Sequence, residues 1–321
     1  MRRPADPLLS LVVPVFNEAD SIDLFLNAVE PFLDSEGLRF EIVFVNDGSR
    51  DDTLAVLLER GARDARIKVV NLSRNFGKEA ALTAGIDHAR GDMLIPMDID
   101  LQDPPGLFKP FVARWREGYD IVYGVRSARD ADTVAKRVSA GWFYRAFNLM
   151  SPVPIPANVG DFRLVDRRAV EVLRRLPERN RFMKGLFAWV GFNAIGVPYE
   201  RPARAAGDSK FNLWRLWNFA LDGVVSFSTV PLRASFYGGL AIAAIAVLYA
   251  LFIVARVLVL GIDTPGYASL LIVVLLMGAI QLVSIGIIGE YLGRLFLEVK
   301  GRPIYVVEGV YEEGQARPPN G

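Results

Sequence analysis

The sequence of 321 residues contains no cysteine and a single histidine, His88. The absence of cysteine excludes disulfide bonds, cysteine nucleophiles and metal sites with thiolate ligands. One histidine excludes metal sites with several imidazole ligands, and it argues against a Ser-His-Asp triad, in which His88 would have to be the base. Lys and Arg number 37 against 36 Asp and Glu, a net charge of +1. Bulk charge therefore provides no basis for binding a polyanion, and we expect no nucleic-acid partner.

Charged residues are almost missing from one long stretch of the chain. Residues 235–289 include only Arg256 and Asp263 as charged side chains. This stretch holds two apolar segments, from residue 236 to about 260 and from 267 to about 288, and each is long enough to cross a membrane. The rest of the chain carries charge at ordinary density. We therefore expect a soluble domain followed by two membrane spans.

The positions of the basic residues predict the orientation of these spans. Arg233 precedes the first span, and Arg294, Lys300 and Arg302 follow the second. Because basic residues favour the cytoplasmic side, both chain ends are expected in the cytoplasm, with the protein in the plasma (inner) membrane. The first apolar run, residues 8–15, is too short for the core of a signal peptide. The first domain is accordingly expected to stay in the cytoplasm.

Just before the first expected span, residues 207–234 mix aromatic and charged side chains. Trp214 and Trp217 are typical of helices that lie at a membrane interface, although an ordinary core helix remains the alternative. The expected organisation is a domain at 1–206, juxtamembrane helices at 207–234, two spans at 235–292 and a cytoplasmic C-terminal tail at 293–321.

The first half of the chain alternates short apolar runs with amphipathic segments. We expect strands at residues 9–15, 41–47, 67–72, 92–98 and 120–124. We expect helices at residues 22–33, 52–60, 77–89 and 105–117. Continuous apolar strands that alternate with helices predict an α/β fold, with a mostly parallel sheet covered by helices on both faces.

Ligands bind at the carboxyl ends of the strands in such sheets, and polar residues follow each expected strand. No Gly-x-Gly-x-x-Gly follows the first strand, which argues against a nicotinamide or flavin enzyme. Glu18 and Asp47 instead offer acceptors for the base and ribose of a nucleotide. Arg74 and Lys78 offer positive charge for its phosphates or its base, although each could also be an ordinary surface charge.

Two carboxylates, Asp98 and Asp100, follow the fourth expected strand. Alternate side chains of a strand point apart, but a turn at this position lets both carboxylates reach one hard cation. Mg²⁺ or Mn²⁺ held there would bridge a diphosphate and stabilise it as a leaving group. The alternative is a solvated turn or a helix cap.

Five segments together resemble the family 2 glycosyltransferases of GT-A fold. These segments are Pro14-Val-Phe-Asn-Glu, Val45-Asn-Asp-Gly-Ser-Arg-Asp-Asp-Thr, Ser73-Arg-Asn-Phe-Gly-Lys-Glu-Ala-Ala-Leu, Asp98-Ile-Asp-Leu-Gln-Asp-Pro-Pro and Gly160-Asp-Phe-Arg-Leu-Val-Asp-Arg. The group most similar is the polyprenyl-phosphate glycosyltransferases, which include the bactoprenol glucosyltransferases and the dolichol-phosphate mannose synthases. The resemblance extends to the two spans and to the ending Glu298-Val-Lys-Gly-Arg-Pro. One departure is Ile99, where the family usually has a small residue; we expect Ile99 to crowd the donor sugar and affect donor choice.

The resemblance implies inverting transfer of one sugar from a nucleotide-sugar to polyprenyl (undecaprenyl) phosphate at the cytoplasmic membrane face, with Mg²⁺ or Mn²⁺ as cofactor. UDP-glucose is the first choice of donor. GDP-mannose, UDP-N-acetylglucosamine, UDP-galacturonate and a UDP-linked formylated aminoarabinose stay open, as does a homo-oligomer. Three other classes are alternatives. The first is a non-catalytic membrane-anchored nucleotide-sugar binding protein. The second is a processive synthase, whose Gln-x-x-Arg-Trp motif is missing, and the third is a transporter, for which two spans offer no enclosed path.

The resemblance also implies a role for individual residues. Asp98, Asp100 and Gln102 would bind the metal, with Asp100 counted among the catalytic residues. Glu18, Asp47, Arg74 and Lys78 would contact the nucleotide-sugar, together with the backbone near Pro14 and Phe16. Asp161 would act on the acceptor side as base or positioning group. The lipid phosphate would be held by Arg126, Arg137 and Ser139, because a guanidinium group binds phosphate through two parallel hydrogen bonds. A lid near the donor would be formed by Arg201, Arg204, Ser209 and Lys210. Since a lipid phosphate is already anionic, it needs neutralising charge and alignment more than a strong base.

Overall fold

The computed structural model describes residues 3–35, 37–126, 159–179, 181, 183–199, 229–260, 266–312 and 315–317. Its strands are β1 (Leu8–Val15), β2 (Arg39–Asn46), β3 (Ile67–Leu72), β4 (Met93–Pro96), β5 (Ile121–Arg126), β6 (Val159–Asp166), β7 (Ala194–Tyr199), β8 (Val307–Glu312) and β9 (Gln315–Arg317). Its helices are α1 (Ala19–Ser35), α2 (Thr53–Arg63), α3 (Lys78–His88), α4 (Phe108–Arg116) after a 3₁₀ turn at Pro105–Leu107, α6 (Arg167–Arg175), α7 (Met183–Trp189), α9 (Val230–Leu260) and α10 (Tyr267–Val299).

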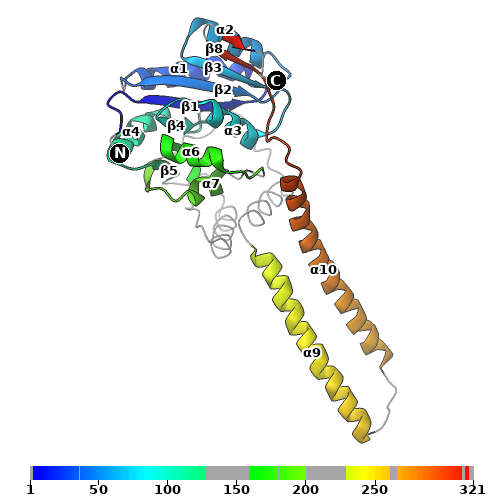
Figure 1. Cartoon of the computed structure of the whole chain (residues 1–321). Helices are drawn as coiled ribbons and strands as arrows, with labels where there is room; N and C mark the ends of the chain where they lie inside the picture. Colours follow the sequence, from blue (N-terminus) through cyan, green and yellow to red (C-terminus); the bar gives the residue numbers. More distant parts are fainter. Residues whose placement is uncertain are drawn as a thin grey trace.

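The strands form one nine-stranded sheet in the order β7-β5-β6-β4-β1-β2-β3-β8-β9 (Figure 1). Its centre, β4-β1-β2-β3, is parallel, which confirms the prediction of an α/β fold with a parallel sheet between helices. On the flanks β6 runs antiparallel to β4 and β5, and β8 runs antiparallel to β3. Val15 lies beside Asn46, and Asn46 beside Asn71, so the polar residues that follow these three strands meet at one edge.

Each face of the sheet has its own buried core. Along β1, successive side chains alternate between them: Val13 packs with α1, α2 and α4, and Val12 packs with α3, α6 and α7. Helix α3 lies close to the sheet, because a Cβ at Gly85 would collide with the side chain of Val12. The continuous apolar character of the central strands therefore reflects burial on both faces.

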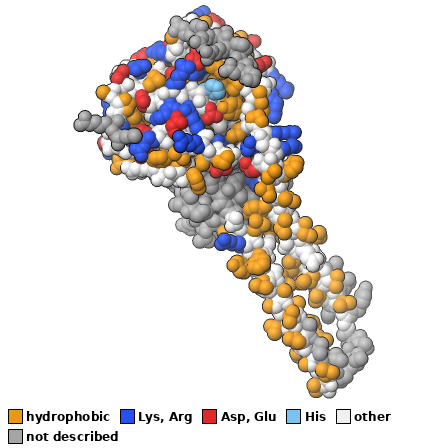
Figure 2. Space-filling view, viewed as in Figure 1, with side chains coloured by type: hydrophobic (Ala, Val, Ile, Leu, Met, Phe, Trp, Pro, Cys, Tyr) orange, Lys and Arg blue, Asp and Glu red, His pale blue; other side chains and the backbone are white. Residues whose placement is uncertain are grey.

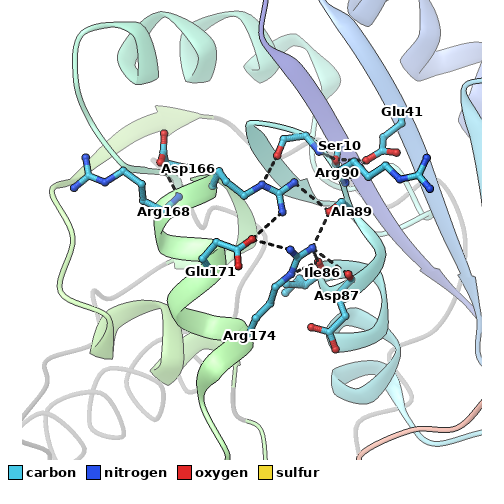
Figure 3. Close-up of polar contacts among 12 residues, drawn as sticks. Ser10, Glu41, Ile86, Asp87, Ala89, Arg90, Asp166, Arg168, Glu171 and Arg174 are labelled. Carbon is cyan, nitrogen blue, oxygen red and sulfur yellow. Dashed lines mark hydrogen bonds and ion pairs between the residues drawn. The ribbon is translucent and has the colours of Figure 1, made fainter. Parts of the chain in front are cut away.

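Helix α6 is fixed to the C-terminal end of α3 by two arginines (Figure 3). Arg174 donates to the carbonyls of Ile86 and Ala89 at 2.6 and 2.7 Å, and Arg167 donates to Ala89 at 3.1 Å. Glu171 pairs with both arginines. These side chains satisfy carbonyls that a helix end leaves without partners, and they orient α3, which carries Lys78 at its other end.

Helices α9 and α10 lie side by side and project away from the sheet (Figure 1). Apolar side chains cover much of their visible surface (Figure 2), and Leu248 and Leu282 are 67 % and 72 % exposed. The windows Leu232–Ile253 and Leu276–Val299 are long and apolar enough to cross a membrane by length and composition. The helices contain both expected spans, and α10 continues past residue 288 to its end at Val299.

The chain returns to the sheet after α10, where only a tail was expected. Strand β8 pairs with β3, and Tyr305 donates through its hydroxyl to Asp87 at 2.7 Å. At the end of α10, the Glu298 carboxylate accepts the backbone N–H of Arg179 at 2.9 Å. Residues 307–312 therefore belong to the same sheet as the N-terminal strands. Most of the expected juxtamembrane segment, residues 207–228, lies outside the described residues.

Candidate functional site

A cavity of about 440 Å³ opens at the carboxyl ends of β1, β2 and β3. Phe16 and Arg74, both predicted to contact the donor nucleotide, line it. The Phe16 side chain is 42 % exposed, and the guanidinium carbon of Arg74 lies 4.1 Å from the ring centre of Phe76. We call this cavity the strand-end pocket. Its lining residues are Phe16, Asn17, Asn46, Gly48, Ser49, Arg50, Leu54, Asn71, Leu72, Ser73, Arg74, Asn75 and Glu308.

Asp47, another predicted nucleotide contact, holds the loop at residues 73–77 and is not among the residues that line the pocket. Its carboxylate accepts the backbone N–H groups of Phe76 and Gly77 at 2.7 and 2.9 Å. Burial raises the pKa of Asp47, although these two hydrogen bonds oppose the rise. The next residue, Gly48, has φ +65°, and a Cβ there would collide with the backbone of Arg74. Asp47 and Gly48 thus set the position of one pocket wall.

The loops after β1 and β2 are joined by hydrogen bonds. Asn17 has φ +55°, and its backbone N–H donates to the Ser49 hydroxyl at 2.9 Å. The N–H of Glu18 donates to the Thr53 hydroxyl at 2.9 Å, and the Glu18 carboxylate accepts the Ser21 hydroxyl at 2.7 Å. Glu18, a predicted nucleotide contact, therefore serves the start of α1 in this structure, while Asn17 lines the pocket. Asn17 follows the first expected strand, and that position is the sequence signal that pointed to it; asparagine also tolerates the left-handed conformation seen here.

The strand-end pocket contains a directional chain of side-chain hydrogen bonds that sequence reasoning missed. The Asn46 amide donates to Asn71 Oδ1 at 2.7 Å, and the Asn71 amide donates to Glu308 Oε2 at 2.8 Å. Asn46 and Asn71 are buried. Asn46 and Asn71 stand near the ends of the expected strands 41–47 and 67–72, which only weakly indicates that their side chains meet. Nothing in the sequence indicated that Glu308, 237 positions from Asn71, would join them.

Four predicted residues meet in a second, small cavity. Pro14, Lys78, Asp98 and Asp161 all line it. The ammonium of Lys78 lies 2.7 Å from Asp98 Oδ1 and 3.5 Å from Asp161 Oδ2. Lys184 of α7 approaches Asp161 Oδ1 at 3.9 Å. Lys78, at the first position of α3, therefore joins the acidic residue after β4 to the acidic residue of β6.

The charges in this cavity support one another. Burial alone would lower the pKa of Lys78, but the carboxylates of Asp98 and Asp161 outweigh it and raise that pKa. Burial would raise the pKa of Asp161, but Lys184, Lys78 and Arg163 together lower it. Asp161 is therefore ionised at neutral pH. Its Oδ1 atom is buried without a hydrogen-bond partner among the described residues.

Sequence reasoning missed three charged residues around Asp161: Glu79, Arg163 and Lys184. Burial lowers the pKa of Arg163 to about 10, and its guanidinium carbon lies 4.3 Å from the ring centre of Phe187. Burial, with the negative charge of Asp161, raises the pKa of Glu79 to about 7. Within the quoted motifs Glu79 follows Lys78 directly and Arg163 stands two residues after Asp161, but no pattern of residue types marked them.

The predicted metal ligands lie on a turn after β4, as expected. Asp100 Oδ1 accepts the backbone N–H of Gln102 at 3.2 Å, and Leu101 between them has φ +54°. Asp98 and Asp100 present carboxylate oxygens, and Gln102 carries an amide oxygen. Such hard ligands suit Mg²⁺ or Mn²⁺, so the residues present fit the expected cation. Ile99 packs in the core at 6 % exposure, so the expectation that it crowds the donor sugar is wrong.

The expected lipid-phosphate and lid residues fall largely outside the described residues. Arg126 is the last residue of β5, and its side chain is not described. The remaining predicted residues outside the description are Arg137, Ser139, Arg201, Arg204, Ser209 and Lys210.

Comparisons with known proteins agree with this geometry. Residues 10–174 match the model of Glycosyl transferase family 2. An uncharacterized glycosyltransferase of Synechocystis sp. is 49 % identical over 94 % of this chain and 95 % of that protein. The bactoprenol glucosyl transferase of Shigella phage SfII is 47 % identical over 94 % of this chain and 97 % of that protein.

Among solved structures, a mannosyltransferase from Pyrobaculum calidifontis in complex with GDP-Man and Mn²⁺ aligns with a TM-score of 0.50, covering 92 % of this chain and 87 % of that one. At 18 % identity this likeness concerns the fold alone, and it agrees with the expected GT-A architecture. The family match includes every residue that lines the strand-end pocket and the charged cavity except Glu308. The chain therefore belongs to glycosyl transferase family 2.

Proposed function

We propose that the protein transfers a single sugar from a nucleotide-sugar, with UDP-glucose as first choice, to polyprenyl phosphate at the cytoplasmic membrane face, with inversion at the sugar C1. One observation carries the proposal: the loop whose Arg74 and Asn75 line the strand-end pocket continues into Lys78, which lines the charged cavity together with Asp98 and Asp161. The chain also has two helices long enough for a membrane. Relatives at 46–47 % identity that are bactoprenol glucosyl transferases support the choice of acceptor and sugar.

The proposed donor site spans both cavities. The nucleoside lies in the strand-end pocket, and the diphosphate extends toward Lys78 and the turn with Asp98 and Asp100. A divalent cation held by Asp98, Asp100 and Gln102, when bound, neutralises the charge that develops on the diphosphate leaving group. Asp98 already pairs with Lys78. When the metal ion binds, the Lys78 ammonium would either keep its contact with the Asp98 carboxylate or turn toward the phosphates of the donor.

The proposed acceptor group needs charge and alignment more than proton removal. A phosphate monoester oxygen is anionic at neutral pH and attacks C1 as the bond to the diphosphate breaks. Asp161, ionised and with one carboxylate oxygen lacking a hydrogen-bond partner among the described residues, lies where it can orient the acceptor or the sugar. Arg126, Arg137 and Ser139 are the proposed lipid-phosphate ligands, and the segment with Arg201, Arg204, Ser209 and Lys210 is the proposed lid.

In the proposed setting α9 and α10 cross the plasma membrane with both chain ends in the cytoplasm. This arrangement keeps the sheet beside the surface at which a polyprenyl phosphate presents its head group. The juxtamembrane residues 207–228 would then lie in the interface, with Trp214 and Trp217 at the level of the head groups.

The test is a donor panel with the full-length protein in detergent. Undecaprenyl phosphate and Mg²⁺ or Mn²⁺ are incubated with each nucleotide-sugar separately, and the lipid-linked product is detected by mass spectrometry. We expect glucose transfer from UDP-glucose that EDTA abolishes. Asp100→Asn should lower the rate by about 100-fold or more through weakened metal binding. Asp52→Asn is the matched control, because Asp52 is an exposed carboxylate at the start of α2 whose side chain makes no capping hydrogen bond. This variant should keep the wild-type rate.

Two results would contradict the proposal. Clear nucleotide binding without product from any donor would favour the non-catalytic binding protein. Wild-type turnover by Asp100→Asn, or turnover that survives EDTA, would remove the metal from the mechanism while leaving the reaction itself in place.

A further inference from the structure

The last turn of α10 is tied to the connection between α6 and α7, which we call the α6–α7 connection. The Glu298 carboxylate accepts the backbone N–H of Arg179 in this connection through both oxygens, at 2.9 and 3.2 Å. The Arg179 side chain donates through Nε to the carbonyl of Arg302 at 2.7 Å. In Figure 1 the C-terminal end of α10 and α7 lie on the same side of the sheet. The chain that leaves the second apolar helix is thus bonded to this connection both before and after the helix ends.

Glu298 lies where the apolar surface of α10 ends. The segment long and apolar enough to cross a membrane runs to Val299, and Leu297 and Val299 are 59 % and 76 % exposed. The Glu298 side chain between them is only partly exposed. A carboxylate at such a boundary needs a polar partner, and the N–H of Arg179 provides it. The α6–α7 connection therefore lies at the level at which α10 would leave a bilayer.

The α6–α7 connection leads directly into the charged cavity. Met183, four residues after Arg179, begins α7, and its backbone N–H donates to the Glu79 carboxyl group at 3.3 Å. The next residue, Lys184, approaches Asp161 Oδ1 at 3.9 Å. A short stretch of chain thus separates the residue that Glu298 holds from two residues that contact the charged cluster.

Hydrogen bonds from Arg181 stiffen this connection. Its guanidinium donates to the carbonyls of Leu173 and Leu176 at 3.1 and 2.8 Å, and its Nε donates to that of Glu178 at 3.2 Å. These bonds join the end of α6 to the connection. A displacement at Arg179 should therefore move the start of α7 as well, because the chain between them is held rather than free to absorb it.

We propose that Glu298 is a positioning residue that holds the charged cavity at a fixed height above the membrane. This assignment rests on the proposed function, since it takes the acceptor to be a phosphate carried by a lipid. The bilayer fixes the depth of that phosphate, so the cavity must lie at a matching height for the phosphate oxygen to meet the sugar C1. A misplacement of about 1 Å lowers the rate of such a transfer by up to about 100-fold.

Three variants separate this role from others. Glu298→Ala removes both acceptors of the Arg179 N–H, whereas Glu298→Gln keeps one carbonyl oxygen for it. Glu290→Ala is the matched control on the same helix, because Glu290 pairs with Arg294 of α10 at 2.9 Å. The pairing of β8 with β3 is untouched in all three, so the sheet should stay folded and attached to the helices.

The first measurement compares sugar transfer with nucleotide binding. Each full-length variant is reconstituted into vesicles of phosphatidylethanolamine and phosphatidylglycerol that contain undecaprenyl phosphate and Mg²⁺. Glu298→Ala should lower kcat for glucose transfer from UDP-glucose about tenfold or more while the Kd for UDP stays unchanged. Glu298→Gln should keep most of the wild-type kcat, and Glu290→Ala all of it. General damage to the fold would weaken UDP binding as well.

The second measurement does not depend on turnover. The protein has no cysteine, so Arg175→Cys, at the exposed end of α6, introduces a single thiol for a fluorescent dye. Energy transfer from this dye to dye-labelled lipid reports the distance between the sheet and the bilayer surface. Glu298→Ala in this background should broaden the distribution of that distance, and Glu290→Ala should leave it unchanged.

An unchanged distance distribution in Glu298→Ala, or a broadened one with wild-type kcat, would overturn the assignment. A loss of UDP affinity equal to the loss of kcat would overturn it too, because Glu298 would then support the donor site. An absence of sugar transfer by the wild type would contradict the proposed function. The distance measurement alone would then decide whether Glu298 holds the sheet at its height.

Discussion

Asp161 lies among three cations, Lys78, Lys184 and Arg163, each on a different element. Burial makes ionisation of the Asp161 carboxyl group unfavourable, and the combined charge of these three cations offsets that cost, so the carboxylate stays ionised. Glu79 is the carboxyl group whose pKa this arrangement raises, to about 7, because burial and the charge of Asp161 outweigh the hydrogen bond from the backbone N–H of Met183 at 3.3 Å, which favours the ionised form. The site thus contains two neighbouring carboxyl groups whose pKa values move in opposite directions: that of Asp161 is lowered and that of Glu79 is raised.

Glu79 should make the stability of the fold depend on pH. Burial raises its pKa from 4.5 to about 7, so between these values the folded protein holds a proton that the unfolded chain releases. The free energy of unfolding therefore falls as pH rises through this window, by about 3 kcal/mol at most. Glu79→Gln removes this dependence while keeping an acceptor for Met183. Unfolding midpoints measured from pH 5 to pH 8 should fall less in the variant than in the wild type.

The matched control for that series is Glu59→Gln, because Glu59 pairs with Arg63 on the exposed side of α2. It should reproduce the wild-type slope. An identical slope in Glu79→Gln would mean that Glu79 does not retain its proton in the folded protein.

At the scale of residues, the motifs predicted well which side chains converge and poorly what each one touches. Lys78, Asp98 and Asp161 come together as the resemblance implied. Asp47, however, binds two backbone N–H groups, and Ile99 points into the core. Strand periodicity indicates where a side chain lies along the chain, but the partners of Asp47 depend on the path of a loop, which local sequence does not specify.

The wall formed by residues 73–77 is the element on which the pocket depends most. Gly48 allows it, because this residue combines φ +65° with an approach so close that a Cβ would collide with the backbone of Arg74. Gly48→Ala should lower the free energy of unfolding by about 2 kcal/mol or more and should weaken UDP binding, since the loop must move. Chemical denaturation and nucleotide titration would measure both effects.

Gly37→Ala is a strict control for that variant. Gly37 also has a positive φ, +59°, but its added Cβ would meet nothing within 4 Å. It should cost only the backbone conformational term, about 1 kcal/mol, with unchanged UDP affinity. Equal losses in the two variants would show that the loop yields to the added methyl group without cost.

At the scale of elements, strands recognisable from local sequence were predicted, and strands that pair with residues far away in the sequence were not. The five N-terminal strands were predicted close to their observed bounds, because each contains a short apolar run whose residues are mostly buried. The antiparallel strands β6 and β8 were not placed in the sheet, since their partners lie far away in the sequence. Glu308 entered the pocket by the same long-range pairing.

At the scale of the whole molecule, the strand pairing relates the two ends of the α9–α10 pair, which hydropathy alone does not do. Strand β8 pairs with β3, so the two ends of the α9–α10 hairpin lie on the same side of any membrane that the helices cross. If both helices cross a membrane, they therefore cross it in opposite directions, as the apolar pattern and the basic residues Arg233 and Arg294 predict. The pairing fixes this relation, while the choice of side rests on the basic residues.

The natural lack of cysteine makes that choice of side testable, because a single introduced thiol is the only one in the protein. Asp263→Cys lies between the two helices, and Asp6→Cys replaces an exposed residue before β1. In intact cells a membrane-impermeant maleimide should label Asp263→Cys and should reach Asp6→Cys only after permeabilisation. Labelling of both variants in intact cells would place the sheet outside the cytoplasm, away from nucleotide-sugars. Protection of both would mean that the hairpin does not cross, and the sheet would then meet the proposed lipid acceptor from a helix pair lying on the membrane surface.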